Sequence, residues 1–399
     1  MTSSPDRPRL SVLIFLSALA VLPMNMFVPS LPGIASEFAA DFALVNVAVA
    51  GYAAVNAVTH FFAGALSDRF GRKPVALAAL AIFTVASIGC SVATSIGMFL
   101  SCRLLQGVVI AGYSVSLAAI RDTSEEGAAT SRIGYVSSAW AIAPMIGPVF
   151  GGLLEEAFGW RASFIAFAVL GILGLCLAVL RLEETNRRPS TSIASQLKGY
   201  RDLGRSTQFW AYALCMAFSV GTLYAFLGGA PLVAAQLQPG GSSITLGICL
   251  GLVPAGFMLG SYFTGHLGVR YAPDRFIIAG RALASAGLLA GLALYASGAT
   301  HLLAFFGPCV CVGLGNGLTM PAANARVLSM QPALAGTAAG LAATLTVTGA
   351  SIVAFLSGLI VTASNAHYAV LGVMLASALL SFALALVAPG SIRRNGPSS

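Results

Sequence analysis

Charged side chains are scarce in this chain of 399 residues. Asp, Glu, Lys and Arg together make up 9% of it, whereas 57% of the residues are hydrophobic. A soluble globular domain carries charge on roughly a quarter of its residues. The composition therefore argues against a water-soluble protein, and the uncharged residues fall in long uninterrupted runs, which indicates a chain embedded in a lipid bilayer.

The chain also lacks the patterns that accompany catalysis or cofactor binding. Its four histidines and thirteen acidic residues show no metal-ligand spacing, no Ser/His/Asp order and no phosphate-binding glycine loop. All seven cysteines lie within apolar runs without a C-x-x-C pair, so we interpret them as small buried hydrophobic residues. We therefore expect neither an enzyme nor a bound cofactor or metal ion.

Apolar runs of about twenty residues can cross a hydrocarbon core of about 30 Å as helices. The first run follows two arginines, as a signal peptide would, but no small-residue cleavage site is evident and many runs follow, so we interpret it as a helix. The sequence thus predicts an all-α integral membrane protein with twelve transmembrane helices. Their expected positions are residues 10–32, 42–66, 75–96, 98–120, 133–155, 162–181, 208–232, 244–266, 276–298, 302–325, 336–361 and 366–388.

Basic residues predict the orientation, because the cytoplasmic loops of membrane proteins are enriched in Lys and Arg. With both termini in the cytoplasm, Arg161 is the one basic residue expected in an outer loop, while Arg103 and Arg281 fall within spans. The net charge of +8 is then a signal of topology, and no nucleic-acid partner is expected.

A polar segment divides the chain into two parts of six spans each. Residues 1–182 and 207–399 are the expected bundles, and the linker 183–206 carries apolar residues at helical spacing that predict a short amphipathic helix on the cytoplasmic surface. The segment Gly64-Ala-Leu-Ser-Asp-Arg-Phe is echoed by Gly265-His-Leu-Gly-Val-Arg-Tyr. This repeat predicts two pseudo-symmetric six-helix bundles, an architecture common among transporters.

Three motifs sharpen this prediction. The segment Gly64-Ala-Leu-Ser-Asp-Arg-Phe-Gly-Arg-Lys-Pro74 places a cluster of charge in a tight turn between two uncharged runs. A later span contains Arg103-Leu-Leu-Gln-Gly107, and the next contains Gly147-Pro-Val-Phe-Gly-Gly152. In these motifs and their topological positions the chain resembles the major facilitator superfamily, and in particular its Bcr/CflA-like branch of drug-resistance proteins.

The resemblance implies a secondary active transporter in the inner membrane of a bacterium. It would export small lipophilic, drug-like compounds by alternating access, with the proton as coupling ion, and would work as a monomer in the bilayer. Export of a metabolite such as a sugar or amino-acid derivative is an open alternative. A non-transporting membrane sensor is disfavoured, because a sensor has no need of gating motifs on both membrane faces.

The resemblance also assigns gating residues. Asp68 is expected to cap the helix that begins near Ala335-Gly336-Thr337 when the cytoplasmic side is closed. The small face of the fifth span is expected to form a contact between the bundles, with Gly247, Gly251 and Gly256 as its partner face. The complete expected gating set is Gly64, Asp68, Arg69, Gly71, Arg72, Lys73, Gly147, Pro148, Gly151 and Gly152.

A substrate cavity is expected at the membrane midplane between the bundles. An arginine within a span usually faces a cavity because burying it in lipid is costly, and Gln106 shares the helix face of Arg103. The polar and aromatic residues expected to line the cavity are Asn25, Tyr52, Asn56, Arg103, Gln106, Tyr113, Trp140, Tyr224, Phe226 and Asn316.

The sequence departs from the family branch at the residue that would carry the proton. Where the branch has an aspartate in its first helix, this chain has Asn25, which cannot titrate, and no Asp or Glu lies near the centre of a predicted span. His60, Asp41 and Asp122 are candidates for proton coupling, and Glu37 and Asp68 remain open as well. The sequence therefore leaves several candidates for the residue that binds the coupled proton.

Overall fold

The computed structural model describes residues 10–123, 126–186, 203–268, 270–330, 335–362 and 364–394. In this part of the chain the regular elements are all helices. Eleven helical stretches among the described residues are long and apolar enough to cross a membrane. The chain is a multi-pass membrane protein, as its composition predicts.

The helices of the N-terminal part agree with the predicted spans to within a few residues. They are α1 (Leu10–Met26), η1 (Val28–Ser30), α2 (Leu31–Glu37), α3 (Phe42–Phe70), α4 (Arg72–Ser91), α5 (Ile96–Gln106), η2 (Gly107–Ile110), α6 (Ala111–Thr123), α7 (Glu126–Phe158) and α8 (Arg161–Arg181). The predicted first span continues through η1 into α2, where Pro29 and Pro32 break the regular α-helical pattern. The predicted fourth span is interrupted by η2 at Gly107, because the backbone of α3 approaches closely there.

The C-terminal part matches its predicted spans equally well. It contains α10 (Thr207–Leu237), α11 (Ser243–Leu267), α12 (Pro273–Ala296), α13 (Leu302–Met330), α14 (Ala335–Ile360) and α15 (Ala366–Arg394). The amphipathic helix predicted in the linker falls mainly on residues 187–202, which lie outside the described residues. All seven cysteines are unpaired.

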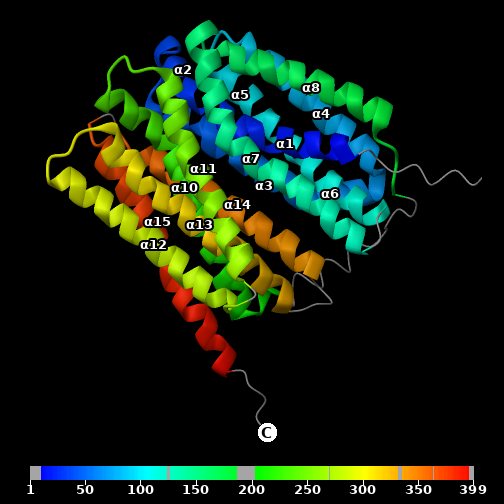
Figure 1. The fold of residues 1–399 in the computed structure, drawn as a ribbon. Coiled ribbons are helices and arrows are strands. Elements are labelled where there is room, and N and C mark those ends of the chain that lie inside the picture. The colour runs from blue at the N-terminus through cyan, green and yellow to red at the C-terminus, as the bar shows by residue number, and fades with distance from the viewer. Residues whose placement is uncertain are drawn as a thin grey trace, which may run out of the picture.

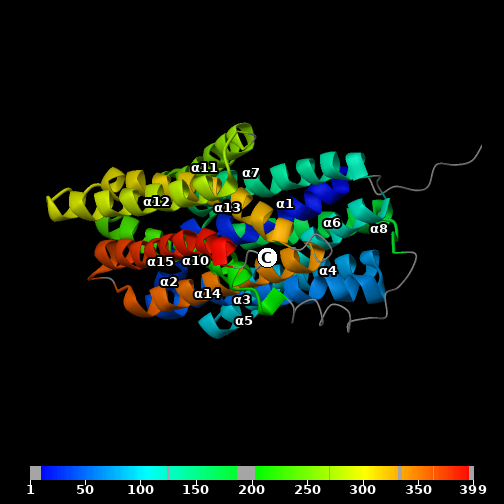
Figure 2. The same ribbon diagram turned by 90° about the horizontal axis from the view of Figure 1, so that it is seen from below.

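The helices group by their order in the chain. Figures 1 and 2 show α1 to α8, coloured blue to green, on one side of the molecule, and α10 to α15, coloured green to red, on the other. For brevity we call these two groups the first and second half. The halves meet along two seams, in which α7 packs against α11 and α3 packs against α14.

Small residues let the backbones meet in the α7–α11 seam. A Cβ atom on Gly152 would collide with the carbonyl of Ser243, and one on Gly247 with that of Pro148. A Cβ on Gly251 would lie 2.8 Å from the Met145 carbonyl oxygen. Such close approach is how helices associate in lipid, where the hydrophobic effect does not drive them together.

Three glycines near this seam contact helices of their own half instead. The expectation that Gly147 and Gly151 belong to the contact between the bundles was wrong, because both pack against α1 of the first half, Gly151 on the Met26 carbonyl and Gly147 beside Asn25. The expectation that Gly256 shares the α11 face was wrong, because it packs against α13, where a Cβ would lie 2.8 Å from the Val310 carbonyl oxygen. Gly256 follows Gly251 by five residues, which turn an α-helix by about 140°.

The second seam is held by a buried asparagine that the sequence analysis did not single out. Asn46 of α3 is 3% exposed, and its Nδ2 donates to the Ala354 carbonyl of α14 at 2.8 Å. Its amide group occupies space left by Gly228 of α10 and Gly358 of α14. A side chain at either glycine would displace the amide.

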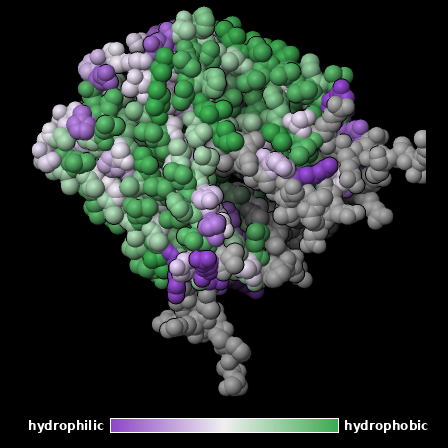
Figure 3. Space-filling view, in the orientation of Figure 1, coloured by the Kyte–Doolittle hydropathy of each residue, from purple (hydrophilic) through white to green (hydrophobic). Residues whose placement is uncertain are grey.

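These contacts between the halves lie toward one face of the membrane domain. We call that face the Trp160 end and the opposite face the Asp68 end. At the Asp68 end the ion pairs join residues of the same half, Arg72 with Asp122 and Arg326 with Asp274, and Figure 3 shows a hollow on that side of the molecule. Among the described residues, the contacts that join the halves thus lie toward the Trp160 end, whereas the ion pairs at the Asp68 end stay within one half.

The glycine contacts predict that alanine lowers the stability of the protein at Gly151 but not at Gly64. Gly151→Ala should destabilise the protein, because the added Cβ meets the α1 backbone, which cannot rotate away. Gly64 has no neighbour within 4 Å of its Cβ position, so Gly64→Ala should be neutral or stabilise the helix by about 0.5–1 kcal/mol. Thermal unfolding of the purified variants in detergent measures both, and equal melting temperatures would contradict the packing described.

Candidate functional site

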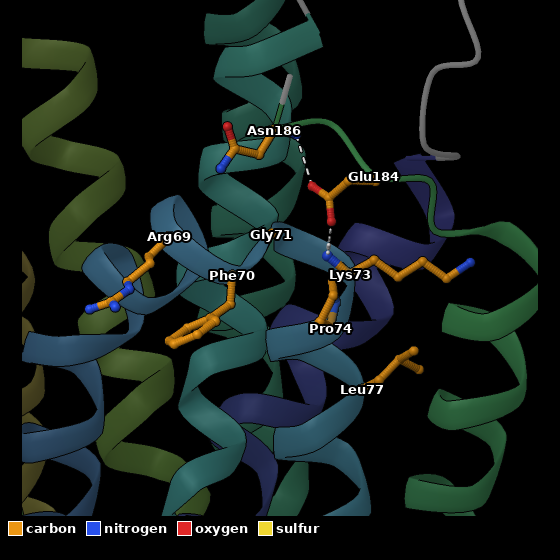
Figure 4. Close-up of a pocket in the computed structure, with 8 residues that line it drawn as sticks. All are labelled: Arg69, Phe70, Gly71, Lys73, Pro74, Leu77, Glu184 and Asn186. Carbon is orange, nitrogen blue, oxygen red and sulfur yellow. Dashed lines mark hydrogen bonds between the residues drawn. The ribbon is translucent and has the colours of Figure 1, made fainter. Parts of the chain in front are cut away.

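The turn between α3 and α4 is built around Gly71. Its φ of +98° is a conformation that favours glycine. The carboxylate of Glu184 lies against the position of the missing side chain and accepts hydrogen bonds from the backbone N–H groups of Arg72, at 2.9 Å, and Lys73, at 3.1 Å. Figure 4 shows Glu184 beside Gly71 and its bond to Lys73. Glu184 therefore caps the N-terminus of α4, where the helix dipole favours an anion, and ties the segment after α8 to the turn.

Arg72 is the centre of an ion-pair network at the Asp68 end. Its Nη1 lies 2.5 Å from Asp68 Oδ1 and donates to Ser67 Oγ at 2.6 Å, and its Nε donates to Asp122 Oδ2 at 3.0 Å. Thr185 also donates to Asp122. Asp68 and the coupling candidate Asp122 are thus held by one arginine inside the first half.

A shallow pocket opens beside this turn. Its lining residues are Arg69, Phe70, Gly71, Lys73, Pro74, Leu77, Glu184 and Asn186. Arg69 lies over the ring of Phe70, and Lys73 Nζ donates to the Val179 carbonyl at 2.9 Å. Because all of these residues belong to α3, α4 and the segment after α8, this pocket is distinct from the expected cavity between the halves.

Arg103 is fully enclosed in the first half rather than facing an open cavity. Its guanidinium donates to the carbonyls of Ala48, at 3.3 Å, and Pro23, at 2.7 Å, and to Gln106 Oε1 at 2.6 Å. The rings of Phe27 and Tyr52 lie 3.9 Å and 4.1 Å from it, and Gln106 donates onward to Ser87 at 2.7 Å. One cation therefore ties α1, α3, α4 and α5 together without a carboxylate partner.

The second half has a comparable tie at Arg281, which the sequence analysis noted only as a cation within a span. Arg281 is fully buried and donates to Thr319 Oγ1 at 2.9 Å and to Asn316 Oδ1 at 2.6 Å. Asn316 in turn donates to the Ser219 carbonyl of α10 at 3.0 Å. Asn316, expected to line the cavity, is therefore 3% exposed and joins α10, α12 and α13.

Four other residues that were expected to line the cavity lie mostly within the packed interior. Asn25 is buried against Gly147 of α7 and bonds the Val21 carbonyl of its own helix at 3.1 Å. Tyr52 is fully buried on α3, and Tyr224 lies on α10, a helix of the second half that contacts α3. Asn56 is 9% exposed.

Five further predicted residues remain, and their surroundings differ. The His60 ring lies 6.2 Å from that of Tyr113 on α6. Phe226 packs with Phe305 and Phe306 in the interior of the second half, away from a cavity wall. The side chain of Trp140 lies outside the described residues. Asp41, a coupling candidate, is exposed just before α3.

The described helices define a multi-pass helical membrane protein. The sequence profile of the Major Facilitator Superfamily matches residues 13–354. The chain belongs to the Major Facilitator Superfamily.

Individual relatives agree with this assignment. The chain is 29% identical over 375 residues to the multidrug resistance protein MdtL of Shigella flexneri, covering 92% of each chain. It is equally identical, over 374 residues, to the MdtL protein of Escherichia coli strain K12 / DH10B.

Solved structures show the same fold at low identity. A bacterial homologue of the human lysosomal transporter Spinster, in an inward-facing and occupied conformation, matches with a TM-score of 0.76 at 14% identity over 98% of both chains. A D-xylose-proton symporter matches with a TM-score of 0.74 at 14% identity, covering 94% of this chain and 96% of that one.

The enclosed position of Arg103 predicts a large effect on stability. Arg103→Ala leaves the Pro23 and Ala48 carbonyls and Gln106 without this donor, and each buried acceptor left unsatisfied costs about 1–3 kcal/mol. Arg103→Lys should recover only part of this, because an ammonium cannot satisfy the same fork of acceptors. Thermal unfolding in detergent measures the loss.

The matched control is Arg161→Ala. Arg161 is also paired, with Glu37 at 2.7 Å, but 36% of its side chain is exposed, so its removal should cost about 1 kcal/mol or less. If the alanine variants of Arg103 and Arg161 unfold at the same temperature, the described network does not hold the first half together.

Proposed function

We propose that this protein exports small lipophilic compounds from a bacterium by alternating access, driven by proton antiport across the inner membrane. The observation that carries the proposal is the glycine seam between α7 and α11, which joins the halves at one end, whereas the ion pairs at the other end stay within one half. Two helical halves with a contact of this kind can rock about a central site. The MdtL relatives, which are multidrug resistance proteins, support lipophilic drugs as the substrate class.

The proposed topology has twelve spans. α7 is the twelfth, beside the eleven stretches that length and composition identify, and residues 1–182 and 207–399 are the two bundles joined by the linker 183–206. Both termini are cytoplasmic in this assignment. Because basic residues concentrate at the Asp68 end, that end faces the cytoplasm and the Trp160 end faces outward, so the described arrangement is open to the cytoplasm.

The substrate would bind between the halves, above the cytoplasmic opening. Tyr52 and Tyr224 form the outer limit of this space, and His60 and Tyr113 lie nearer the Asp68 end. Tyr52 and His60 are eight residues apart on α3, which corresponds to about 12 Å along the helix. Aromatic and apolar walls with few fixed polar groups suit chemically varied lipophilic ligands, and we propose that a single chain is sufficient.

The inner gate would work through Asp68. In the described arrangement Asp68 pairs with Arg72 of its own turn. When the cytoplasmic end closes, we propose that Asp68 accepts hydrogen bonds from the first N–H groups of α14, so that the carboxylate changes partners between the two states.

Expression in an efflux-deficient bacterial strain tests the proposed function. Cells that carry the protein should tolerate higher concentrations of lipophilic drugs than cells with the empty vector, and a protonophore should remove the difference. The Gly152→Leu variant is the matched control, because a leucine in the seam blocks closure of the outer end. Equal drug susceptibility of cells with and without the wild-type protein, across a broad panel, would contradict multidrug export.

The gate has its own test in Asp68→Asn. A neutral amide should slow transport by about tenfold or more while drug binding is retained, because charge-assisted hydrogen bonds worth about 1.5–3 kcal/mol are lost in one state only. Glu183→Gln removes an exposed acid near the same turn and should leave transport unchanged. Transport into vesicles and equilibrium drug binding, measured on both variants, distinguish a gating defect from a binding defect, and full transport by Asp68→Asn would reject this gate.

A further inference from the structure

Two adjacent acids end α7 at the Trp160 end, and they face different neighbours. Glu156 reaches across the seam, where its Oε2 accepts a hydrogen bond from Ser242 Oγ at 2.5 Å and lies 3.4 Å from the backbone N–H donor of Ile244. It thereby caps the N-terminus of α11 in the second half. Glu155 turns away from the seam and toward α2 of its own half.

The Glu155 carboxyl is enclosed in a space that Gly33 leaves open. Its Oε1 lies 2.7 Å from the position of a Cβ on Gly33, and the Trp160 ring borders the same space. The Glu155 side chain is partly buried, and among the described residues its Oε2 atom and the fully buried hydroxyl of Ser30 beside it have only each other as hydrogen-bond partners. The site therefore holds a carboxyl oxygen and a hydroxyl oxygen that no other protein donor satisfies.

The charged groups at this end do not neutralise Glu155. Arg161 of α8 is the nearby cation, and it is engaged by Glu37 of α2 at 2.7 Å. The Trp160 N–H also donates to Glu37, at 2.6 Å. Glu156 is an acid itself, and Asp41 is exposed just before α3. The α11 residues that meet α7 here, Ser242 to Ile244, carry no charge.

An ionised carboxylate in such a place loses hydration at Oε2 and gains only the Ser30 hydroxyl as a donor, and no cation, which is unfavourable. A protonated carboxyl avoids this cost, and its O–H can donate to the Ser30 hydroxyl. We propose that Glu155 is a proton-binding site of the outer gate, which holds a proton while the Trp160 end is closed and releases it when that end opens to water.

The site is positioned to sense that opening. η1 and α2, which cover Glu155, also contact α10 and α11 of the second half, and Glu156 next to it holds α11. This inference rests on the proposed alternating access. When the outer end opens, these elements separate and water reaches the Glu155 carboxyl. Each closure then takes up one proton from the outer side, so the equilibrium between closed and open states shifts by up to tenfold per pH unit, with acid favouring the closed state.

Infrared spectroscopy of the full-length protein in lipid nanodiscs tests this directly. At neutral pH the wild type should show a protonated-carboxyl stretching band, which disappears in Glu155→Gln and is retained, with a shift in frequency, in Glu155→Asp. Glu156→Gln removes the neighbouring acid and should leave the band intact. The measurement needs neither drug nor gradient, so its outcome is separate from that of the export assay.

A second readout follows the conformational equilibrium. The wild type should lose closure at the Trp160 end as the pH rises, Glu155→Gln should stay closed without a pH dependence, and Glu156→Gln should close less at every pH but keep the dependence. A protonated-carboxyl band that survives in Glu155→Gln, or its absence from the wild type at neutral pH, would overturn the proposal. An unchanged pH dependence in Glu155→Gln would also overturn it.

Discussion

The close contact of two backbones across the α7–α11 seam is the constraint on which the rest of the arrangement depends. Within a bilayer, helices gain little from hiding apolar surface from lipid, so association requires close packing. Gly152 and Gly247 allow the carbonyls of Ser243 and Pro148 to approach. Because backbone meets backbone at these glycines, the contact can separate and reform with the loss of few side-chain hydrogen bonds, those of Glu156 to Ser242 and Ile244 at its outer end. That property suits a joint between moving parts.

The halves themselves are held differently. Arg103 joins four helical elements of the first half through carbonyls, an amide and two aromatic rings, and Arg281 joins three helices of the second through Asn316 and Thr319. Such networks are costly to break part by part. Because each half is held by a buried polar network and the α7–α11 seam is not, the halves can move as two rigid bodies. Alternating access requires this kind of motion.

Much of the fold could be predicted from the sequence, because a bilayer imposes a length and an apolar composition on every span. Close packing at the glycines from Gly147 to Gly152 could also be predicted, but the helix that each one contacts could not, since Gly152 meets α11 whereas Gly147 and Gly151 meet α1. The partners of Arg103 and Asn316 were not legible. An arginine within a span satisfies its donors either at a cavity or among carbonyls of neighbouring helices, and only the three-dimensional arrangement distinguishes the two.

The surroundings of Glu155 also could not be predicted from the sequence. Glu155 is the last residue of the predicted span 133–155, where acids ordinarily face the membrane surface, so its position alone does not predict a proton-binding site. Its enclosure depends on Gly33 and Ser30, more than a hundred residues earlier in the chain, and no local pattern joins them. Asn46 was missed for a similar reason, because the glycines that accommodate it belong to the second half.

The central claim is that the two ends open and close in opposition about the seam. Spin-label distances in nanodiscs test it with one pair on α7 and α11 at each end, Tyr135 with Tyr262 toward the Asp68 end and Phe158 with Ile248 toward the Trp160 end. All four side chains are exposed, so labels there leave the packing intact. On changing the pH or adding a transported drug, the account predicts that one distance shortens as the other lengthens. Distances that change in the same direction, or that never change, would contradict it.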